Sequence, residues 1–289
     1  MRRVRAAAIL GWGSSTKDLA PFQKDSAVEW MLGLPESSAQ AEAVLLFGGD
    51  GTIHRHLRQL VELRLPLLVV PRGSGNDFAR ALGFKNSRRS LETWSAFVSG
   101  ERQPHAIDLG LVTELNSGRS SYFCCVAGVG LDGEIARRAN QLPRWLRGHG
   151  GYALSFPGAL AGFAQFPLNL STANADGSWD VRRKKPTIVA AFANTPHYGG
   201  GMKIAPGAQF DDGELDVCLL SDIDKFKLFC LFPTVYFGKH LSVPQVEYFQ
   251  ETKLRVETGR PLDVYADGEY VCQTPIEVGV VPRALRVIF

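Results

Sequence analysis

Two glycine-rich loops hold the residue types with the clearest chemical potential. The first, Gly48-Gly49-Asp50-Gly51-Thr52, directly follows the apolar run 44–47. Glycines let backbone N–H groups approach a phosphate without interference from a Cβ atom, and a helix beginning at about Thr52 would add its positive end. Asp50 would repel a phosphate, so it is better explained as a ligand of magnesium or of its water shell. Alone, this segment is equally typical of a plain strand–turn–helix connection.

A second loop favours the phosphate site. Residues 69–71 lead into Arg72-Gly73-Ser74-Gly75-Asn76-Asp77, which combines small residues with a hydroxyl, an amide and a carboxylate. Asn76-Asp77 alone could also be a helix N-cap. Because neighbouring parallel strands end at the same edge of a sheet, the two loops together predict a polyphosphate cleft with metal-binding carboxylates.

The elements that must position these loops are visible as apolar runs. Residues 4–10, 43–47 and 65–70 are apolar throughout, apart from Arg5, and do not alternate with polar residues, as expected for parallel strands covered on both faces. Residues 39–43 and 54–63 between them have helical composition. This order predicts a doubly wound α/β domain over residues 1–105.

After about residue 103 strand-like runs become frequent, with turn signals at 176–177, 212–213 and 267–268 between several of them. The runs are 107–112, 121–129, 186–193, 215–220, 253–257, 262–265, 276–280 and 285–289. This pattern predicts a mostly antiparallel β domain over residues 106–289, with helical segments at 133–166 and 225–240.

The bulk composition excludes several classes of protein. The 289 residues are 45% hydrophobic and 21% charged, which is wrong for a disordered chain, and the net charge of +3 is too balanced to indicate nucleic-acid binding. Five cysteines without a C-x-x-C pair indicate buried, reduced thiols and a cytoplasmic protein. The sequence contains no run of about eighteen apolar residues, so no membrane span is predicted. Residues 1–10 are better explained as a first strand than as a signal peptide.

The order of the motifs resembles that of the diacylglycerol kinase catalytic-domain family, which includes bacterial soluble diacylglycerol kinases, related phospholipid kinases, and sphingosine and ceramide kinases. NAD kinases and phosphofructokinases share the first motif, so it indicates only a superfamily. The second, Pro71-x-Gly73-Ser74-Gly75-Asn76-Asp77-Phe78-Ala79, is much more specific. The match continues through 107–110, 127–132, 193–194, 199–201, 205–206, 211–216 and 267–269.

The resemblance implies a fold and a set of roles. The first domain would be Rossmann-like, as in phosphofructokinase and NAD kinase, the second a β-sandwich, and ATP would bind between them. Asp267 would be the general base for the lipid hydroxyl, and Glu269 would support it. Residues implied for ATP are Gly48, Gly49, Asp50, Gly51, Thr52, Gly73, Ser74 and Asn76. Catalytic magnesium would be held by Asp50, Asp77 and Asp108, partly through water, and a second, structural magnesium by Gln209, Asp212 and Glu214.

Some of these segments also fit plainer structures or depart from the family pattern. Asp267-Gly268 is also typical of an ordinary hairpin turn. Where the family often has an Asn-Pro-x-x-Gly type loop, this chain has Gly11-Trp12-Gly13-Ser14-Ser15, and where relatives commonly have Asn-Glu-Val it has Ile53-His54-Arg55-His56. His54 and His56 are two residues apart and would not share a helix face, so they are not interpreted as a metal pair.

Two apolar segments, 145–166 and 226–241, are candidates for an acyl-chain cleft; the alternative is that both are helices packed on the sheet. Arginines flank the first segment and could meet anionic head groups or form a solvated face. They are Arg137, Arg138, Arg144 and Arg147.

The sequence thus predicts an ATP- and magnesium-dependent kinase acting on a lipid hydroxyl, such as that of diacylglycerol. Its partner would be a lipid at a membrane surface, reached by peripheral contact from the cytoplasm at the inner face, with no nucleic acid involved. The oligomeric state stays open, a homodimer included. The alternatives are an NAD-kinase-like nucleotide kinase and a catalytically weak lipid- or nucleotide-binding protein.

Overall fold

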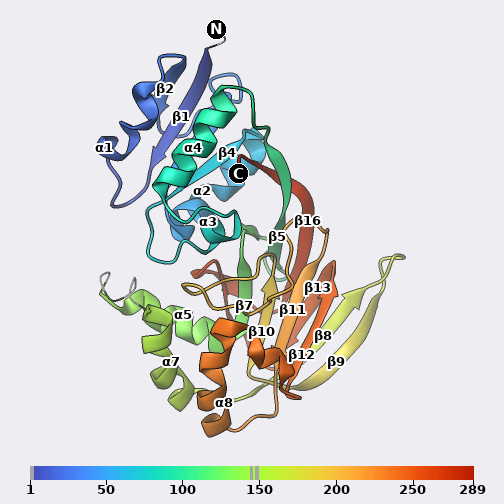
Figure 1. The fold of residues 1–289 in the computed structure, drawn as a ribbon. Coiled ribbons are helices and arrows are strands. Elements are labelled where there is room, and N and C mark those ends of the chain that lie inside the picture. Colours follow the sequence, from blue (N-terminus) through green and yellow to red (C-terminus); the bar gives the residue numbers. More distant parts are fainter. Residues whose placement is uncertain (1–2, 144–145, 147–149) are drawn as a thin grey trace. The chain divides into compact units, whose positions relative to one another are not determined.

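The computed structural model describes residues 3–143, 146 and 150–289 and consists of two compact units (Figure 1). Unit 1 comprises Met1–Ile107 and Arg283–Phe289, and unit 2 comprises Asp108–Pro282. The sequence pattern predicts that all of 106–289 belongs to the second domain. The last residues group with unit 1 instead, because β16 (Ile276–Val287) ends by pairing Val287 with Leu67 in parallel.

Unit 1 is built on a parallel sheet in the order β2-β1-β3-β4, followed by the end of β16. The strands are β1 (Val4–Leu10), β2 (Val28–Leu32), β3 (Ala43–Gly48) and β4 (Leu67–Pro71). Its helices are α1 (Thr16–Leu19), η1 (Phe22–Lys24), α2 (Asp50–Leu63), α3 (Asp77–Ala81) and α4 (Ser87–Val98). The prediction of a doubly wound α/β unit is confirmed. The helix predicted over 39–43 is wrong, because those residues form turns that lead into β3.

Unit 2 is a sandwich of two largely antiparallel sheets. One has the order β12-β11-β10-β7-β14-β15, and the other joins β9, β8, β13 and β16 to the hairpin of β5 and β6. The first sheet comprises β7 (Val126–Gly130), β10 (Val189–Ala193), β11 (Leu215–Leu220), β12 (Val246–Glu251), β14 (Asp263–Ala266) and β15 (Glu269–Gln273). The second comprises β5 (His105–Glu114), β6 (Ser120–Phe123), β8 (Phe166–Ala173), β9 (Trp179–Thr187) and β13 (Lys253–Thr258), with β16. The predicted β-sandwich is confirmed.

The core of unit 2 fills the space between these sheets. Side chains from both inner faces form one buried cluster that includes Phe166, Phe192, Val217, Leu254 and Val278. Strands of a sandwich alternate inward and outward residues. This alternation makes β8, β9 and β12 harder to detect in the sequence than the continuously apolar β3 and β4.

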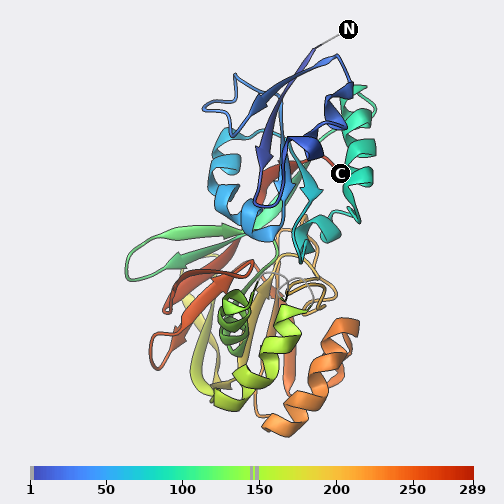
Figure 2. The same cartoon turned by 90° about the vertical axis from the view of Figure 1, so that its left-hand side faces the viewer.

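Helices pack against the sheet that contains β7 and β10. They are α5 (Leu131–Gln141), α7 (Gly151–Gly162), α8 (Lys225–Leu231), η2 (Phe232–Phe237) and η3 (Lys239–Ser242). Figures 1 and 2 show α7 and α8 side by side. These helices largely coincide with the two predicted helical segments, although α5 begins two residues earlier, at Leu131, and η3 ends two residues later, at Ser242. Arg144, Trp145 and Arg147 lie outside the described residues.

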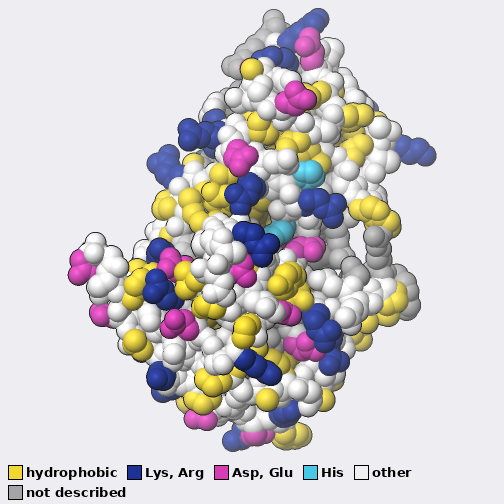
Figure 3. Space-filling view, turned by 180° about the vertical axis from the view of Figure 1, so that it is seen from behind, with side chains coloured by type: hydrophobic (Ala, Val, Ile, Leu, Met, Phe, Trp, Pro, Cys, Tyr) yellow, Lys and Arg dark blue, Asp and Glu magenta, His cyan; other side chains and the backbone are white. Residues whose placement is uncertain are grey.

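Two surface properties bear on function. No helix among the described residues is long and apolar enough to cross a bilayer. Basic and acidic side chains are interspersed over the face shown in Figure 3, in keeping with the small net charge.

We expect Phe192→Ala to lower the free energy of unfolding by roughly 3–5 kcal/mol, because its ring is fully buried in the core of unit 2 and truncation leaves a cavity. Urea denaturation would measure the loss. Val181→Ala, at an exposed position of β9, is the matched control and should change stability little. Equal effects of the two substitutions would contradict this account of the core.

Candidate active site

In unit 1 the two glycine-rich loops are in direct backbone contact. A Cβ atom added to Gly49 would lie 2.6 Å from the Cα of Gly73, and one added to Gly73 would lie 2.4 Å from the Cα of Gly49. A Cβ on Gly48 would meet the side chain of Thr52 at 2.7 Å. Only glycine permits this approach, so the structure brings together the two loops that the sequence assigns to phosphate binding.

Asp50 links the loops through its carboxylate. Its Oδ2 accepts a hydrogen bond from the backbone N–H of Asp77 at 3.0 Å, and its Oδ1 accepts one from Phe78 at 3.0 Å. Helix α2 begins at Asp50 rather than at Thr52, so this carboxylate lies in the first turn of one helix and holds the start of the next. Asp77 is buried and forms an ion pair with Arg80.

Asn76 shapes the second loop rather than capping α3 with its side chain. Its backbone is left-handed, at φ 53°, and its side chain both accepts from Gly73 N at 2.8 Å and donates to Gly73 O at 2.7 Å. Asparagine is among the residues that tolerate this conformation. The loop is thus closed on itself around Gly73, with Arg72 tied to Asp18 by an ion pair.

The loop after β1 lies against the first glycine-rich loop. Gly11 N donates to Phe47 O at 2.8 Å, and Ser14 Oγ donates to the same oxygen at 3.0 Å. A Cβ on Gly11 would collide with Phe47 O and with Thr52. Trp12 follows directly and is 76% exposed. An exposed aromatic residue therefore follows the glycine that contacts Thr52, at the place where the family resemblance implies an Asn-Pro-x-x-Gly type loop.

In unit 2 the Asp267 carboxylate is held by two consecutive backbone amides. Cys124 N donates to Oδ2 and Cys125 N donates to Oδ1, each at 2.8 Å. Asp267 and Gly268 form the two-residue turn between β14 and β15, both with positive φ. The hairpin-turn interpretation is therefore correct for the backbone, and the same turn fixes a half-exposed carboxylate. Glu269 is exposed at the start of β15.

Asn194 ties this turn to Asp108. Its side-chain Nδ2 donates to the carbonyl oxygens of both Asp108 and Cys124 at 3.0 Å, and its backbone N–H donates to Cys125 O at 2.8 Å. Asn194 is fully buried. The sequence pattern includes it in a motif but predicts no role for it; its signal was a polar residue directly after the apolar strand β10.

The 209–214 segment contacts Asp108 as well. The buried Asp108 carboxylate accepts from Gly213 N at 2.8 Å. Asp212 accepts from Glu214 N at 3.1 Å and from Gln250 Nε2 at 3.3 Å. Nowhere in the described part of the chain do three or more His, Cys, Asp or Glu residues form a metal-binding group. The predicted magnesium site at Gln209, Asp212 and Glu214 uses main-chain oxygens besides one carboxylate, and it stays a prediction.

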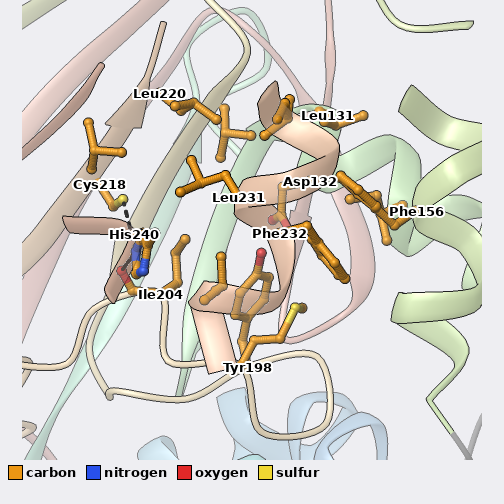
Figure 4. A pocket seen from close by; sticks show the side chains of 16 residues that line it. Leu131, Asp132, Phe156, Tyr198, Ile204, Cys218, Leu220, Leu231, Phe232 and His240 are labelled. Atoms are coloured by element: carbon orange, nitrogen blue, oxygen red, sulfur yellow. Dashed lines mark hydrogen bonds between the residues drawn. The ribbon is translucent and has the colours of Figure 1, made fainter. Parts of the chain in front are cut away.

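An apolar pocket lies in unit 2 beneath the helices (Figure 4). Its cavity volume is about 60 Å³, which is small for a ligand pocket. Both predicted apolar segments contribute to it, through Phe156 of α7 and through Leu228, Leu231 and Phe232.

Three polar side chains, those of Asp132, Tyr198 and His240, interrupt this apolar lining. Asp132 is buried, its Oδ1 has no hydrogen-bond partner, and burial raises its pKa to about 6 although Tyr198 donates a hydrogen bond to it. His240 Nε2 lies 3.1 Å from Ile204 O, and burial lowers the pKa of the ring. In the sequence Asp132 stands out only as a motif residue; its burial in the pocket was not predicted.

Two known protein families match different parts of the chain. Residues 18–112 match the diacylglycerol kinase catalytic domain, and residues 125–289 match the YegS C-terminal NAD kinase beta sandwich-like domain. A diacylglycerol kinase of Mycobacterium tuberculosis is 34% identical over 249 residues, covering 86% of this chain and 76% of the relative. The chain belongs to the diacylglycerol kinase family.

A more distant relative agrees with this assignment, and a solved structure has the same fold. A diacylglycerol kinase of Bacillus subtilis is 26% identical over 86% of this chain and 77% of its own length. The crystal structure of a diacylglycerol kinase from Bacillus anthracis superposes with a TM-score of 0.67 at 16% identity, covering 99% of this chain and 97% of that one. As a member of the diacylglycerol kinase family, the chain is a kinase.

Asp132 should make stability depend on pH. Its raised pKa means that the folded state keeps a proton that the unfolded chain releases, so stability falls as pH rises from the unfolded pKa towards 6 and is constant above it. We expect this group to remove about 1.4 kcal/mol between about pH 5 and about pH 7.5. Asp132→Asn should lack that part of the decline, measured by urea denaturation at each pH.

Tyr198→Phe provides the matched comparison. It removes the hydrogen bond that lowers the Asp132 pKa, so the decline should extend to higher pH. Parallel pH profiles of the wild type and Asp132→Asn would show that this carboxyl does not titrate as its burial requires.

Proposed function

We propose that this kinase transfers the γ-phosphoryl group of ATP to the hydroxyl of a lipid alcohol such as diacylglycerol, with Asp267 as the general base. The observation that carries the proposal is the Asp267 carboxylate, fixed by two amides in a turn of the unit that also holds an apolar pocket. Family membership supports it, since the relatives compared above bear the name diacylglycerol kinase.

The loops of unit 1 would bind the nucleotide. Gly48, Gly49 and Gly73 expose backbone at a point where no side chain fits, which suits the close approach of phosphate oxygens. Thr52 and Ser74 add hydroxyl groups, and Asn76 holds the second loop in shape. Phosphoryl transfer depends mainly on such positioning and on neutralising charge.

The carboxylates suit magnesium, which prefers oxygen ligands and keeps several of its waters. Asp50 and Asp77 lie together in unit 1, and Asp108 is buried in unit 2. When bound, the ion would neutralise phosphate charge. Each Asp50 oxygen accepts one backbone amide of the second loop, so the carboxylate is held in a fixed orientation.

Asp267 would accept the proton of the lipid hydroxyl as the hydroxyl oxygen attacks the γ-phosphorus. The bond from that phosphorus to the bridging oxygen of ADP breaks, so the products are a phosphorylated lipid and ADP. Two amide hydrogen bonds hold the carboxylate in a fixed orientation, as a general base requires. Glu269 follows the turn and would support the site.

The apolar pocket would hold a hydrocarbon chain of the lipid once the helices move apart, since its present cavity of about 60 Å³ is too small for one. Its wall comes from α5, α7, α8 and η2, and its lining is almost wholly apolar. A pyridine nucleotide would instead require several polar partners, so the pocket favours a lipid over the NAD-kinase-like alternative.

The proposal predicts that Asp267→Asn reduces lipid phosphorylation at least about a hundredfold, the usual contribution of a general base. Asparagine tolerates the left-handed backbone of this turn. Transfer of labelled γ-phosphate from ATP into diacylglycerol in mixed micelles would measure it, with ATP binding and melting temperature as controls. Glu269→Gln should have a smaller effect. Equal activity of Asp267→Asn and wild type would show that Asp267 is not the general base. If neither the wild type nor the variant phosphorylated any lipid, the binding-protein alternative would be favoured.

A second prediction concerns the nucleotide. Gly73→Ala should weaken ATP binding about tenfold or more, because the added Cβ forces the two loops apart. Gly259→Ala is the control, since a Cβ there meets only ordinary contacts with Pro167, the nearest at 3.4 Å. Calorimetric titration with ATP would show the difference. Unchanged affinity in Gly73→Ala would place the nucleotide elsewhere.

A further inference from the structure

Helix α7 has an apolar exposed side. Its sequence, GYALSFPGALAG, has no charged or amide side chain. Ser155, Phe156 and Ala159 face inward, whereas Leu154, Pro157 and Ala161 are exposed. A helix between core and water normally carries polar residues on its outer side. The outer side of α7 is therefore not explained by contact with water alone.

The neighbouring α8 and the η2 helix that follows it carry three more exposed phenylalanines, two on α8 and one at the end of η2. Phe226, Phe229 and Phe237 are 76%, 51% and 73% exposed. Isolated exposed apolar residues are ordinary, but a cluster of them marks a binding surface. The helices are joined by the stacked rings of Phe156 and Phe229, 6.2 Å apart, and by the bond from Lys225 Nζ to Ala161 O at 2.7 Å. We call this the apolar surface of α7 and α8, made up of Leu154, Pro157, Ala161, Phe226, Phe229 and Phe237.

Lysines alternate with the phenylalanines. Lys225 and Lys227 flank Phe226, and Lys239 follows Phe237. Two carboxylates lie nearby: Asp222, and Asp224, which caps α8 and lies 3.8 Å from Lys227 Nζ. Phenylalanine and leucine with interspersed lysines are typical of segments that lie in a membrane interface. The cores of protein–protein interfaces are depleted in lysine, so this composition favours a bilayer over a second protein.

The inner side of the same helices walls the apolar pocket. Phe156 of α7 and Leu228 and Leu231 of α8 line it, whereas Phe226 and Phe237 do not. One pair of helices thus separates an apolar pocket from an apolar outer surface. A hydrocarbon chain that moves from a bilayer at this surface into the pocket would pass between these helices.

We propose that the apolar surface of α7 and α8 docks on an anionic bilayer. Phe226, Phe229 and Phe237 enter the boundary between head groups and acyl chains, and Lys225, Lys227 and Lys239 meet lipid phosphates. The entry of substrate from this side rests on the proposed function; the docking itself does not.

Cys230 supplies a probe at the site. It lies on α8 and is exposed, whereas the other four cysteines are buried. A thiol-reactive, environment-sensitive dye on Cys230 should shift to shorter wavelength with vesicles of phosphatidylcholine and phosphatidylglycerol that contain no substrate lipid. Unlabelled protein should co-sediment with the same vesicles. Vesicles of phosphatidylcholine alone should bind it more weakly.

The double variant Phe226→Ser/Phe237→Ser should weaken vesicle binding at least about tenfold, because each ring loses its buried apolar area. Replacing Lys225, Lys227 and Lys239 with glutamine should remove the preference for phosphatidylglycerol and the sensitivity to salt. Val181→Ser, at an equally exposed position of β9, is the matched control and should bind like wild type.

Kinase assays separate this inference from the proposed function. Variants at Phe226 and Phe237 should keep wild-type rates on lipid in detergent micelles and raise the KM on vesicles. Wild type that phosphorylates lipid in micelles but ignores vesicles would overturn the docking and leave the function. Vesicle binding that depends on the phenylalanines, without any lipid phosphorylation, would support the docking and overturn the proposed function. If the wild type is a dimer that the phenylalanine substitutions dissociate, and if it does not bind vesicles, then the surface is an interface with a second copy of the chain and the docking is overturned.

Discussion

The two amides that hold Asp267 are the constraint on which unit 2 depends. Successive N–H groups of a strand point in opposite directions, so Cys124 and Cys125 can donate to one carboxylate only where the strand is interrupted. β6 ends at Phe123 and β7 begins at Val126, which leaves those two residues outside the ladder. Their carbonyl groups are then satisfied by Asn194, through its side chain and its backbone. The cost of breaking the strand is thereby offset by hydrogen bonds, as buried polar groups require.

This arrangement explains why distant motifs belong together. Asn194 bonds Asp108 O as well as Cys124 O, and the Asp108 carboxylate accepts Gly213 N. The 267 turn, the end of β10 and the 211–214 segment are therefore parts of one buried polar network. In such networks the low local dielectric strengthens each bond and makes an unpaired group costly. A change at Asn194 would consequently act on Asp267 without touching any substrate.

The sequence predicted the parallel strands β1, β3 and β4 and the glycine-rich loops well because their signals are local, but it missed β2. β1, β3 and β4 are apolar apart from Arg5 in β1, and the contact of Gly49 with Gly73 follows once their strands are neighbours. It could not predict the partners of Asp50 or Asp267, since these bonds join residues far apart in the chain. β8 and β9 were missed because polar residues interrupt both: Asn169, Ser171 and Thr172 in β8, and the charged residues 182–185 in β9. The exposure of Cys230 was missed because its segment is apolar. The end of β16 was predicted to belong to unit 2 but groups with unit 1, since the pairing of Val287 with Leu67 leaves no local mark in the sequence.

The apolar helices of unit 2 pose an energetic question of their own. Each exposed phenylalanine forgoes roughly 1.5–3 kcal/mol that burial would contribute, and α7 offers no polar side chain to solvate its outer face. Polar residues at Leu154, Phe226 and Phe237 would cost the fold nothing visible, because none of them packs in the core. Their inner neighbours, by contrast, stack closely, with the rings of Phe156 and Phe232 3.9 Å apart. Packing therefore accounts for one side of these helices, and an apolar phase outside the protein accounts for the other.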